Sequence, residues 1–239
     1  MTATPQQWSP NRVARWAGGL YLAYILANIL ASRLGHIGLS DATTLRASIL
    51  DDEGMFRVGL VAALASALLF VLTAWALYVL LRPVDGTLAL LLLVLNAVGV
   101  AVQCASYLPL LFVLSQHGAG TDLPSLTEPQ RQDLALLSVT ASQTGFATAQ
   151  LFFSAWLFPL GWLVLRSGFL PRLLGWLLLL DGAGVLVWFG QALLVPELRA
   201  ISYPSWVVGF LAEFGLGLWL LVRGVRYAAP VRGADEPIG

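Results

Sequence analysis

Long apolar runs, each long enough to form a membrane-crossing helix, alternate with polar connections along the chain. A helix needs about 20 apolar residues to cross a hydrocarbon core of about 30 Å. The pattern therefore predicts an all-α fold, a polytopic transmembrane bundle with about six spanning helices. Windows of about 19 residues place the runs at 13–32, 58–81, 87–114, 146–165, 172–194 and 204–222.

Two of the longer connections are expected to carry helices of their own. In SDATTLRASIL, Ser40 is a candidate N-cap, and Leu45 and Ile49 are spaced four apart, which predicts a short outer amphipathic helix on the bundle or the bilayer surface. Residues 130–165 are expected to form one helix of about 54 Å at 1.5 Å per residue, which exceeds the bilayer core. Its first part should protrude, kink near Gly145 or lie in the interface.

The arginines set the expected orientation, because cytoplasmic connections carry an excess of positive charge. Eight of the thirteen basic residues fall on the side of both termini and five on the other side, so we expect both termini in the cytoplasm of a bacterial cell, with a multi-pass protein in its plasma membrane. We expect a polar tail at 1–11, one six-helix transmembrane domain at 12–226 and a flexible tail at 227–239. The first apolar run is too long for a signal peptide and is expected to be retained.

Composition supports a membrane protein: 58% of residues are hydrophobic and only 11% are charged, whereas soluble domains are nearer a quarter charged. The formal net charge is zero without a basic block, which argues against a nucleic-acid partner. The expected partner is the lipid bilayer, together with a hydrophobic small-molecule substrate. The oligomeric state is left open.

Two carboxylates interrupt the apolar runs: Asp181 in LLLLDGAGVL and Glu213 in GFLAEFGLG. Counted from Arg172 and Arg223, they lie roughly 13 and 15 Å deep. No arginine or histidine is expected at this depth, so desolvation favours the neutral, protonated acids. We expect both to face one internal cavity, reached from the outer side between the third and sixth spans, where they are the candidate catalytic proton donor and acceptor.

Amides and aromatic rings at neighbouring depths are the candidate substrate-binding residues. Alternatively, either acid could tie helices together through a hydrogen bond to an amide, and the rings could simply pack against lipid and helices. The candidates are Asn96, Gln103, Gln150, Phe153, Trp156 and Trp188.

No metal site and no cofactor are expected. His36 and His117 lack the paired spacing of metal-binding histidines. Cys104 is the only cysteine, which excludes an intramolecular disulfide. GxSxG, Walker and CxxC motifs are absent from the sequence.

The chain resembles a bacterial membrane-protein family catalogued as domain-of-unknown-function 4386, over about residues 12–226. The resemblance is carried by RVARWAGGLYLAYILANILA, EGMFRVGLV, ALYVLLRPVDGTLALL, GWLVLRSGFLPRLLGWLL and LAEFGLGLWLLVRGV. RSGFLPRLLGW, from Arg166 to Trp176, is its most specific piece. The resemblance implies a polytopic bundle and supplies no reaction; the family pattern has a glutamate where Glu213 stands.

Three functions remain open at this point. The first is an intramembrane acid/base enzyme, cyclase- or isomerase-like, that acts on a lipid-soluble isoprenoid or acyl substrate through Asp181 and Glu213. The second is a small proton-linked transporter that uses the same acids. The third is a noncatalytic membrane sensor or partner protein.

Overall fold

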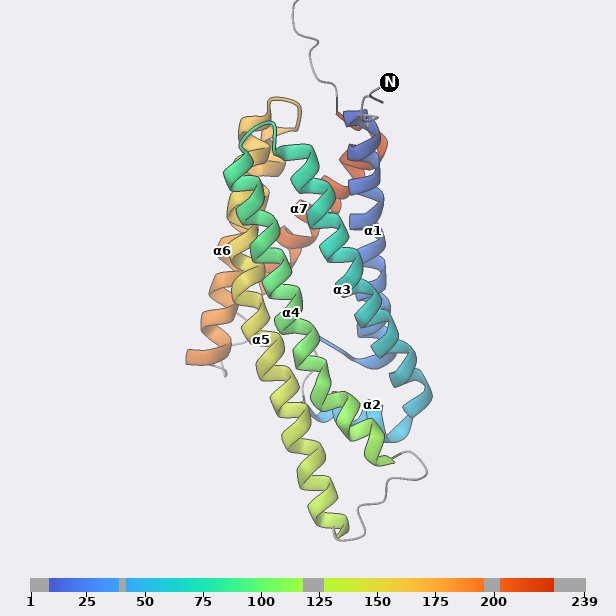
Figure 1. Cartoon of the computed structure of the whole chain (residues 1–239). Coiled ribbons are helices and arrows are strands. Elements are labelled where there is room, and N and C mark those ends of the chain that lie inside the picture. The colour runs from blue at the N-terminus through green and yellow to red at the C-terminus, as the bar shows by residue number, and fades with distance from the viewer. Residues whose placement is uncertain (1–8, 39–41, 118–126, 196–202, 226–239) are drawn as a thin grey trace, which may run out of the picture.

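A computed structural model describes residues 9–38, 42–117, 127–195 and 203–225, and its regular elements are all helices, which confirms the all-α bundle (Figure 1). Five helices are long and apolar enough to cross a membrane: α1, α3, α4, α5 and α6. The sixth predicted span coincides with α7, whose apolar stretch, Val207–Val222, is shorter. The helices are α1 (Pro10–Gly35), α2 (Ala42–Asp51), α3 (Glu53–Leu81), α4 (Gly86–His117), α5 (Glu128–Ser167), α6 (Arg172–Leu194) and α7 (Tyr203–Val222).

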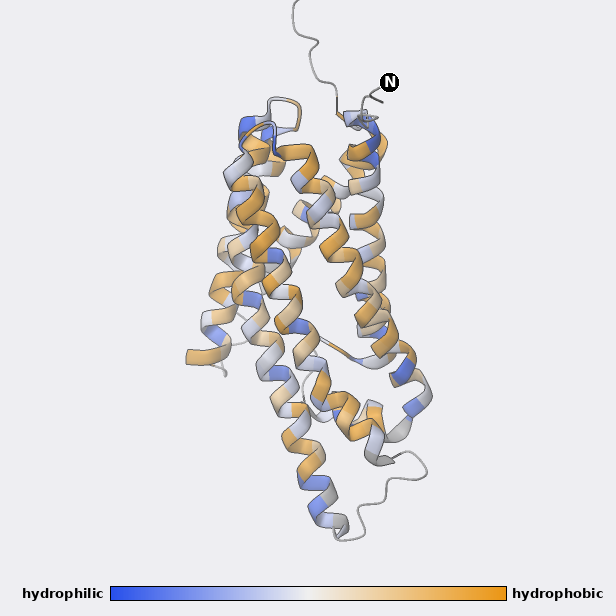
Figure 2. Cartoon of the chain, viewed as in Figure 1, coloured by the Kyte–Doolittle hydropathy of each residue, from blue (hydrophilic) through white to orange (hydrophobic). Residues whose placement is uncertain are grey.

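The six long helices form a ring. Each packs mainly on two others, in the order α1, α3, α4, α5, α6, α7 and back to α1. Most of the helical ribbon is hydrophobic (Figure 2), and many large apolar side chains are exposed on the outside; Leu68, Leu173 and Val207 are each more than 60% exposed. Such a surface is stable only where a bilayer covers it.

The start of α1 and the end of α7 lie side by side at one end of the bundle, called here the N-terminal end (Figure 1). The backbone N–H of Val225 donates to Asn11 Oδ1 at 3.3 Å. Trp16, Trp162 and Trp176 are exposed near this end, where amphipathic rings anchor a protein at a membrane interface. Glycines allow close helix contacts here: a Cβ on Gly18 would lie 2.4 Å from the Leu221 nitrogen.

The opposite end, called here the α2 end, has a second apolar core. The predicted outer helix is present as α2, which packs on α5, α3 and α1, and its Leu45 and Ile49 are buried in an apolar cluster, so it lies on the bundle. The candidate N-cap Ser40 falls outside the described residues. α5 begins well beyond the end of α6 (Figure 1) and runs as one helix through Gly145, which packs on Ser106 of α4. Of the three alternatives for 130–145, protrusion is the one observed.

Candidate functional site

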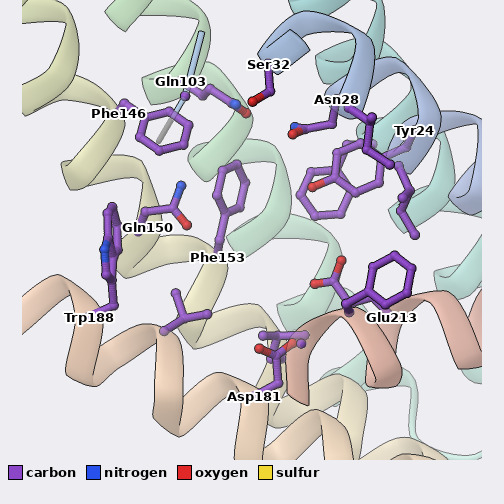
Figure 3. A pocket seen from close by; sticks show the side chains of 18 of the residues that line it. Tyr24, Asn28, Ser32, Gln103, Phe146, Gln150, Phe153, Asp181, Trp188 and Glu213 are labelled. Carbon is purple, nitrogen blue, oxygen red and sulfur yellow. The ribbon is translucent and has the colours of Figure 1, made fainter. Parts of the chain in front are cut away.

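A cavity of about 330 Å³ lies inside the ring of helices, and all six long helices contribute to its lining (Figure 3). The connection after α1 also contributes, through Ile37 and Gly38. Cavities of this size are typical of small-molecule sites. The lining is therefore not restricted to the third to sixth spans: α1 supplies one whole wall.

Asp181 is positioned by the packing of α6 on α5. The Ser154 hydroxyl of α5 donates to the Gly182 carbonyl at 2.8 Å, and the absence of a side chain on Gly182 lets α6 lie against Leu157. A second glycine pair, Gly161 and Gly175, brings the same helices together two turns away. This seam fixes the rotation of α6 and turns Asp181 away from lipid.

The Asp181 carboxyl lies against α7 at Gly209. A Cβ on Gly209 would lie 2.6 Å from Asp181 Oδ1, closer than nonbonded atoms approach, so only glycine leaves room for this carboxyl. Asp181 is 3% exposed, lines the cavity and makes no hydrogen bond to any residue in the described part of the chain.

Glu213 lines the same cavity one helical turn after Gly209. Residues four apart share a face of a helix, so the two carboxyls are neighbours, as Figure 3 shows. The Tyr21 hydroxyl of α1 is buried and has no hydrogen bond of standard geometry among the described residues. Glycines on either side of Glu213 allow close helix contacts, because Gly209 packs on α6 and Gly217 on α1.

Aromatic rings form the wall beside the carboxyls. Tyr24 stacks on Phe70 with ring centroids 4.1 Å apart, and Trp156 meets the same ring edge-on at 5.0 Å. Phe153 lies 5.2 Å from Phe70 and fits against Gly99 of α4, where a Cβ would approach its ring to 2.7 Å. Four rings are thereby held in fixed positions by contacts with one another.

The part of the cavity nearer the α2 end has a polar rim (Figure 3). Gln103 and Gln150 line it together with Asn28 and Ser32 of α1. The Gln103 amide donates to the Tyr107 hydroxyl at 2.9 Å, which fixes its orientation. These groups can donate to or accept from the polar end of a bound molecule.

Between α1 and α7 the cavity reaches the outer surface of the described part of the bundle. Ile29 of α1 and Phe210 of α7 both line the cavity, yet they are 45% and 53% exposed. Both side chains belong to apolar stretches of α1 and α7.

The structure brings most of the sequence-predicted site residues together. Asp181 and Glu213 line the cavity, as do five of the candidate binding residues: Gln103, Gln150, Phe153, Trp156 and Trp188. Asn96 is elsewhere: it is fully buried in α4, outside the cavity lining, and neither amide atom has a hydrogen-bond partner among the described residues.

Sequence reasoning missed the contribution of α1. Tyr24, Asn28 and Ser32 are four residues apart, which places them on one helix face, and all three line the cavity. That spacing in YILANILAS was the available signal. The close contact between Gly209 and Asp181 could not be predicted from the sequence, because it depends on which residue of α6 faces Gly209.

Among the described residues that line the cavity there is no arginine, lysine or histidine. Within the described ranges, histidine, cysteine and acidic side chains form no group of three or more that could hold a metal ion. The chemistry of the described lining is therefore that of two carboxyls, two amides from glutamine, one from asparagine, and aromatic rings.

Comparison with known proteins identifies the family. The family model described as "Domain of unknown function (DUF4386)" matches residues 16–224, and the chain belongs to this family. No curated protein matches the chain significantly. No solved structure matches it significantly either.

Proposed function

We propose that this member of the DUF4386 family is an intramembrane enzyme that binds a lipid-soluble molecule in its central cavity and moves protons to and from it with Asp181 and Glu213. An isoprenoid or acyl compound is the expected class of substrate. One observation carries the proposal: two neighbouring carboxyls, with no basic residue among the described lining, line a cavity whose Ile29 and Phe210 are also exposed on the apolar outer surface. Ionisable groups inside a membrane are costly, and their usual justification is function.

Acid/base chemistry follows from the pairing of the two carboxyls. One of the two carboxyls, in its protonated form, gives its proton to a double bond or a carbonyl oxygen of the substrate, and the other, ionised, removes a proton from an adjacent carbon. The substrate is isomerised with no net gain or loss of protons. The enzyme is left with the protonation states of the two carboxyls exchanged, and a proton passed between these neighbours restores the starting state.

The closed end of the cavity favours an enzyme over a transporter. Below the carboxyls, toward the N-terminal end, the ring is filled by apolar side chains that are less than 3% exposed, among them Leu77, Leu160 and Leu220. A transporter needs access to its site from both sides of the membrane. A cavity with one lateral opening needs only to admit and release a lipid-soluble molecule.

For orientation, we propose that the N-terminal end of the bundle faces the cytoplasm of a bacterial cell. The distribution of arginines supports this placement. The α2 end, with the protruding start of α5, then faces outward. In this orientation the opening between α1 and α7 lies toward the outer half of the bilayer.

The proposal is tested by identifying the lipids that copurify with the protein. Wild-type protein and Asp181→Leu, Glu213→Leu and Asp133→Asn variants are purified in parallel, and extracted lipids are identified by mass spectrometry. Asp133 is an exposed acid of α5 outside the cavity, so its variant is the matched control. A compound retained by the wild type and the control but depleted from the two cavity variants is expected. Identical bulk membrane lipids in all four samples would contradict the proposal.

A further inference from the structure

The described lining of the inner part of the cavity carries acidic groups and no basic ones. Among its described lining residues, Asp181 and Glu213 are the only acidic groups, and none is an arginine, lysine or histidine that could balance them. Asp181 is only 3% exposed, lines the cavity and lacks a hydrogen bond within the described chain. A buried polar group of this kind is stabilised when a partner arrives.

The neighbouring aromatic rings also favour a positively charged ligand. The faces of aromatic rings carry negative potential and attract a cation placed over them within about 6 Å. Tyr24, Phe70, Phe153 and Trp156 form one connected cluster of rings, and all four line the cavity with the carboxyls. Their contacts with one another hold the rings in place, so little rearrangement is needed when a ligand binds.

From this arrangement we infer that the inner part of the cavity is a binding site for a positively charged, lipid-soluble group, such as an ammonium carried on a hydrocarbon body. The inference rests on the proposed function, since it names the chemical class that the same cavity takes. The charged group lies between the Asp181 and Glu213 carboxyls and the ring cluster. The hydrocarbon body extends past Phe210 and Ile29 toward the lipid.

Charge balance explains why a cation and not an anion fits. The ammonium pairs with the ionised carboxyl, so that the two buried charges offset each other. An anionic ligand would find no donor of positive charge among the described lining residues. A neutral ligand of the same shape gains the apolar contacts but not the attraction to the carboxylate and the rings.

A matched pair of small probes tests the inference. Benzyltrimethylammonium and neopentylbenzene have the same shape and the same number of heavy atoms, and differ in whether nitrogen or carbon stands at the branch point. Binding of each to the full-length protein in nanodiscs is measured by isothermal titration calorimetry, with empty nanodiscs subtracted. We expect the cation to bind at least about tenfold more tightly than the neutral probe, a ratio in the range that cation–π and carboxylate contacts provide.

Two variant proteins assign the effect to the site. Asp181→Asn combined with Glu213→Gln keeps the shape of both side chains and removes the charge, and should abolish the preference for the cation. Asp133→Asn removes an exposed acid outside the cavity and should preserve it.

Each outcome of the binding experiment decides the inference. Equal affinities for the two probes, failure of the cation to bind, or a preference that survives in the double variant would overturn it. A retained neutral lipid in the extraction experiment would still support the proposed function, so the two claims fail separately.

Discussion

The Asp181 carboxyl of α6 rests on the backbone of Gly209 in α7, with a separation that leaves no room for a methyl group. A Cβ built on Gly209 would lie 2.6 Å from Oδ1 and 3.1 Å from Cγ of Asp181. This contact joins the two helices that carry the acids. It places the Asp181 carboxyl one helical turn from Glu213, and it makes the position of one acid depend on a residue with no side chain.

Gly209→Ala is expected to displace the Asp181 carboxyl and to lower the free energy of unfolding by about 1–3 kcal/mol, the usual range for an added methyl in a packed site. Gly190→Ala is the control, because a Cβ there meets nothing within 4 Å. It should be neutral or stabilising, by up to about 1 kcal/mol from helix propensity. Thermal unfolding in detergent measures both. Equal stability of the two variants would show that the close contact is absent.

Asp181→Asn and Asp181→Leu separate a chemical role from a structural one. Asparagine has nearly the shape of aspartate whereas leucine is bulkier, and Asp181 has no hydrogen bond to lose within the described chain. We therefore expect the asparagine variant to unfold at or above the wild-type temperature and both variants to lose activity. A loss on the order of 1 kcal/mol in the leucine variant alone, with full function in the asparagine variant, would indicate that Asp181 only ties helices together.

Gly18→Ala should weaken the contact between α1 and α7. A Cβ on Gly18 would lie 2.4 Å from the Leu221 nitrogen and 2.5 Å from the Gly217 oxygen, both backbone atoms that cannot move without shifting a helix. The neighbouring Gly19→Ala is the control, since its nearest contact is a Leu221 methyl at 3.9 Å. The first variant should lose at least about 1–3 kcal/mol in thermal unfolding, and the second should match the wild type.

Cysteine labelling tests the orientation. In a Cys104→Ser background, Arg82→Cys places a thiol in the exposed turn between α3 and α4, and Asp133→Cys places one on the protruding part of α5. A membrane-impermeant thiol reagent added to intact cells should label only the Asp133→Cys variant, and lysis should expose the other. The reverse pattern would invert the orientation.

The sequence predicted the number and position of the long helices well, because the length of an apolar run is set by the thickness of the bilayer and needs no tertiary information. It also placed Asp181 and Glu213 at one depth, since distance along a helix follows from residue number. Which of the residues at that depth line the cavity depends on how the helices are arranged in the ring, which residue number does not give. Asn96 lies at a similar depth on α4, yet it is buried outside the cavity lining.

The contribution of α1 to the site, which was not predicted from the sequence, illustrates the same limit. The expected opening lay between the third and sixth spans, whereas α1 closes the ring against α7 and carries Tyr24, Asn28 and Ser32 into the cavity. Contacts between the first and last helices depend on backbone approach at Gly18 and Gly217. Hydropathy does not report such approach, because glycines in a membrane helix also occur without close packing.

Deuterium transfer is the most direct test of the central claim, that Asp181 and Glu213 move protons on a bound lipid-soluble molecule. Protein purified with its retained compound is placed in deuterated water, and the extracted compound is analysed by mass spectrometry for deuterium bound to carbon. The wild type and Asp133→Asn should introduce deuterium over time, whereas Asp181→Asn and Glu213→Gln should introduce none above the rate in solution. Equal incorporation in the wild type and in both cavity variants, or none in any of them, would contradict the account.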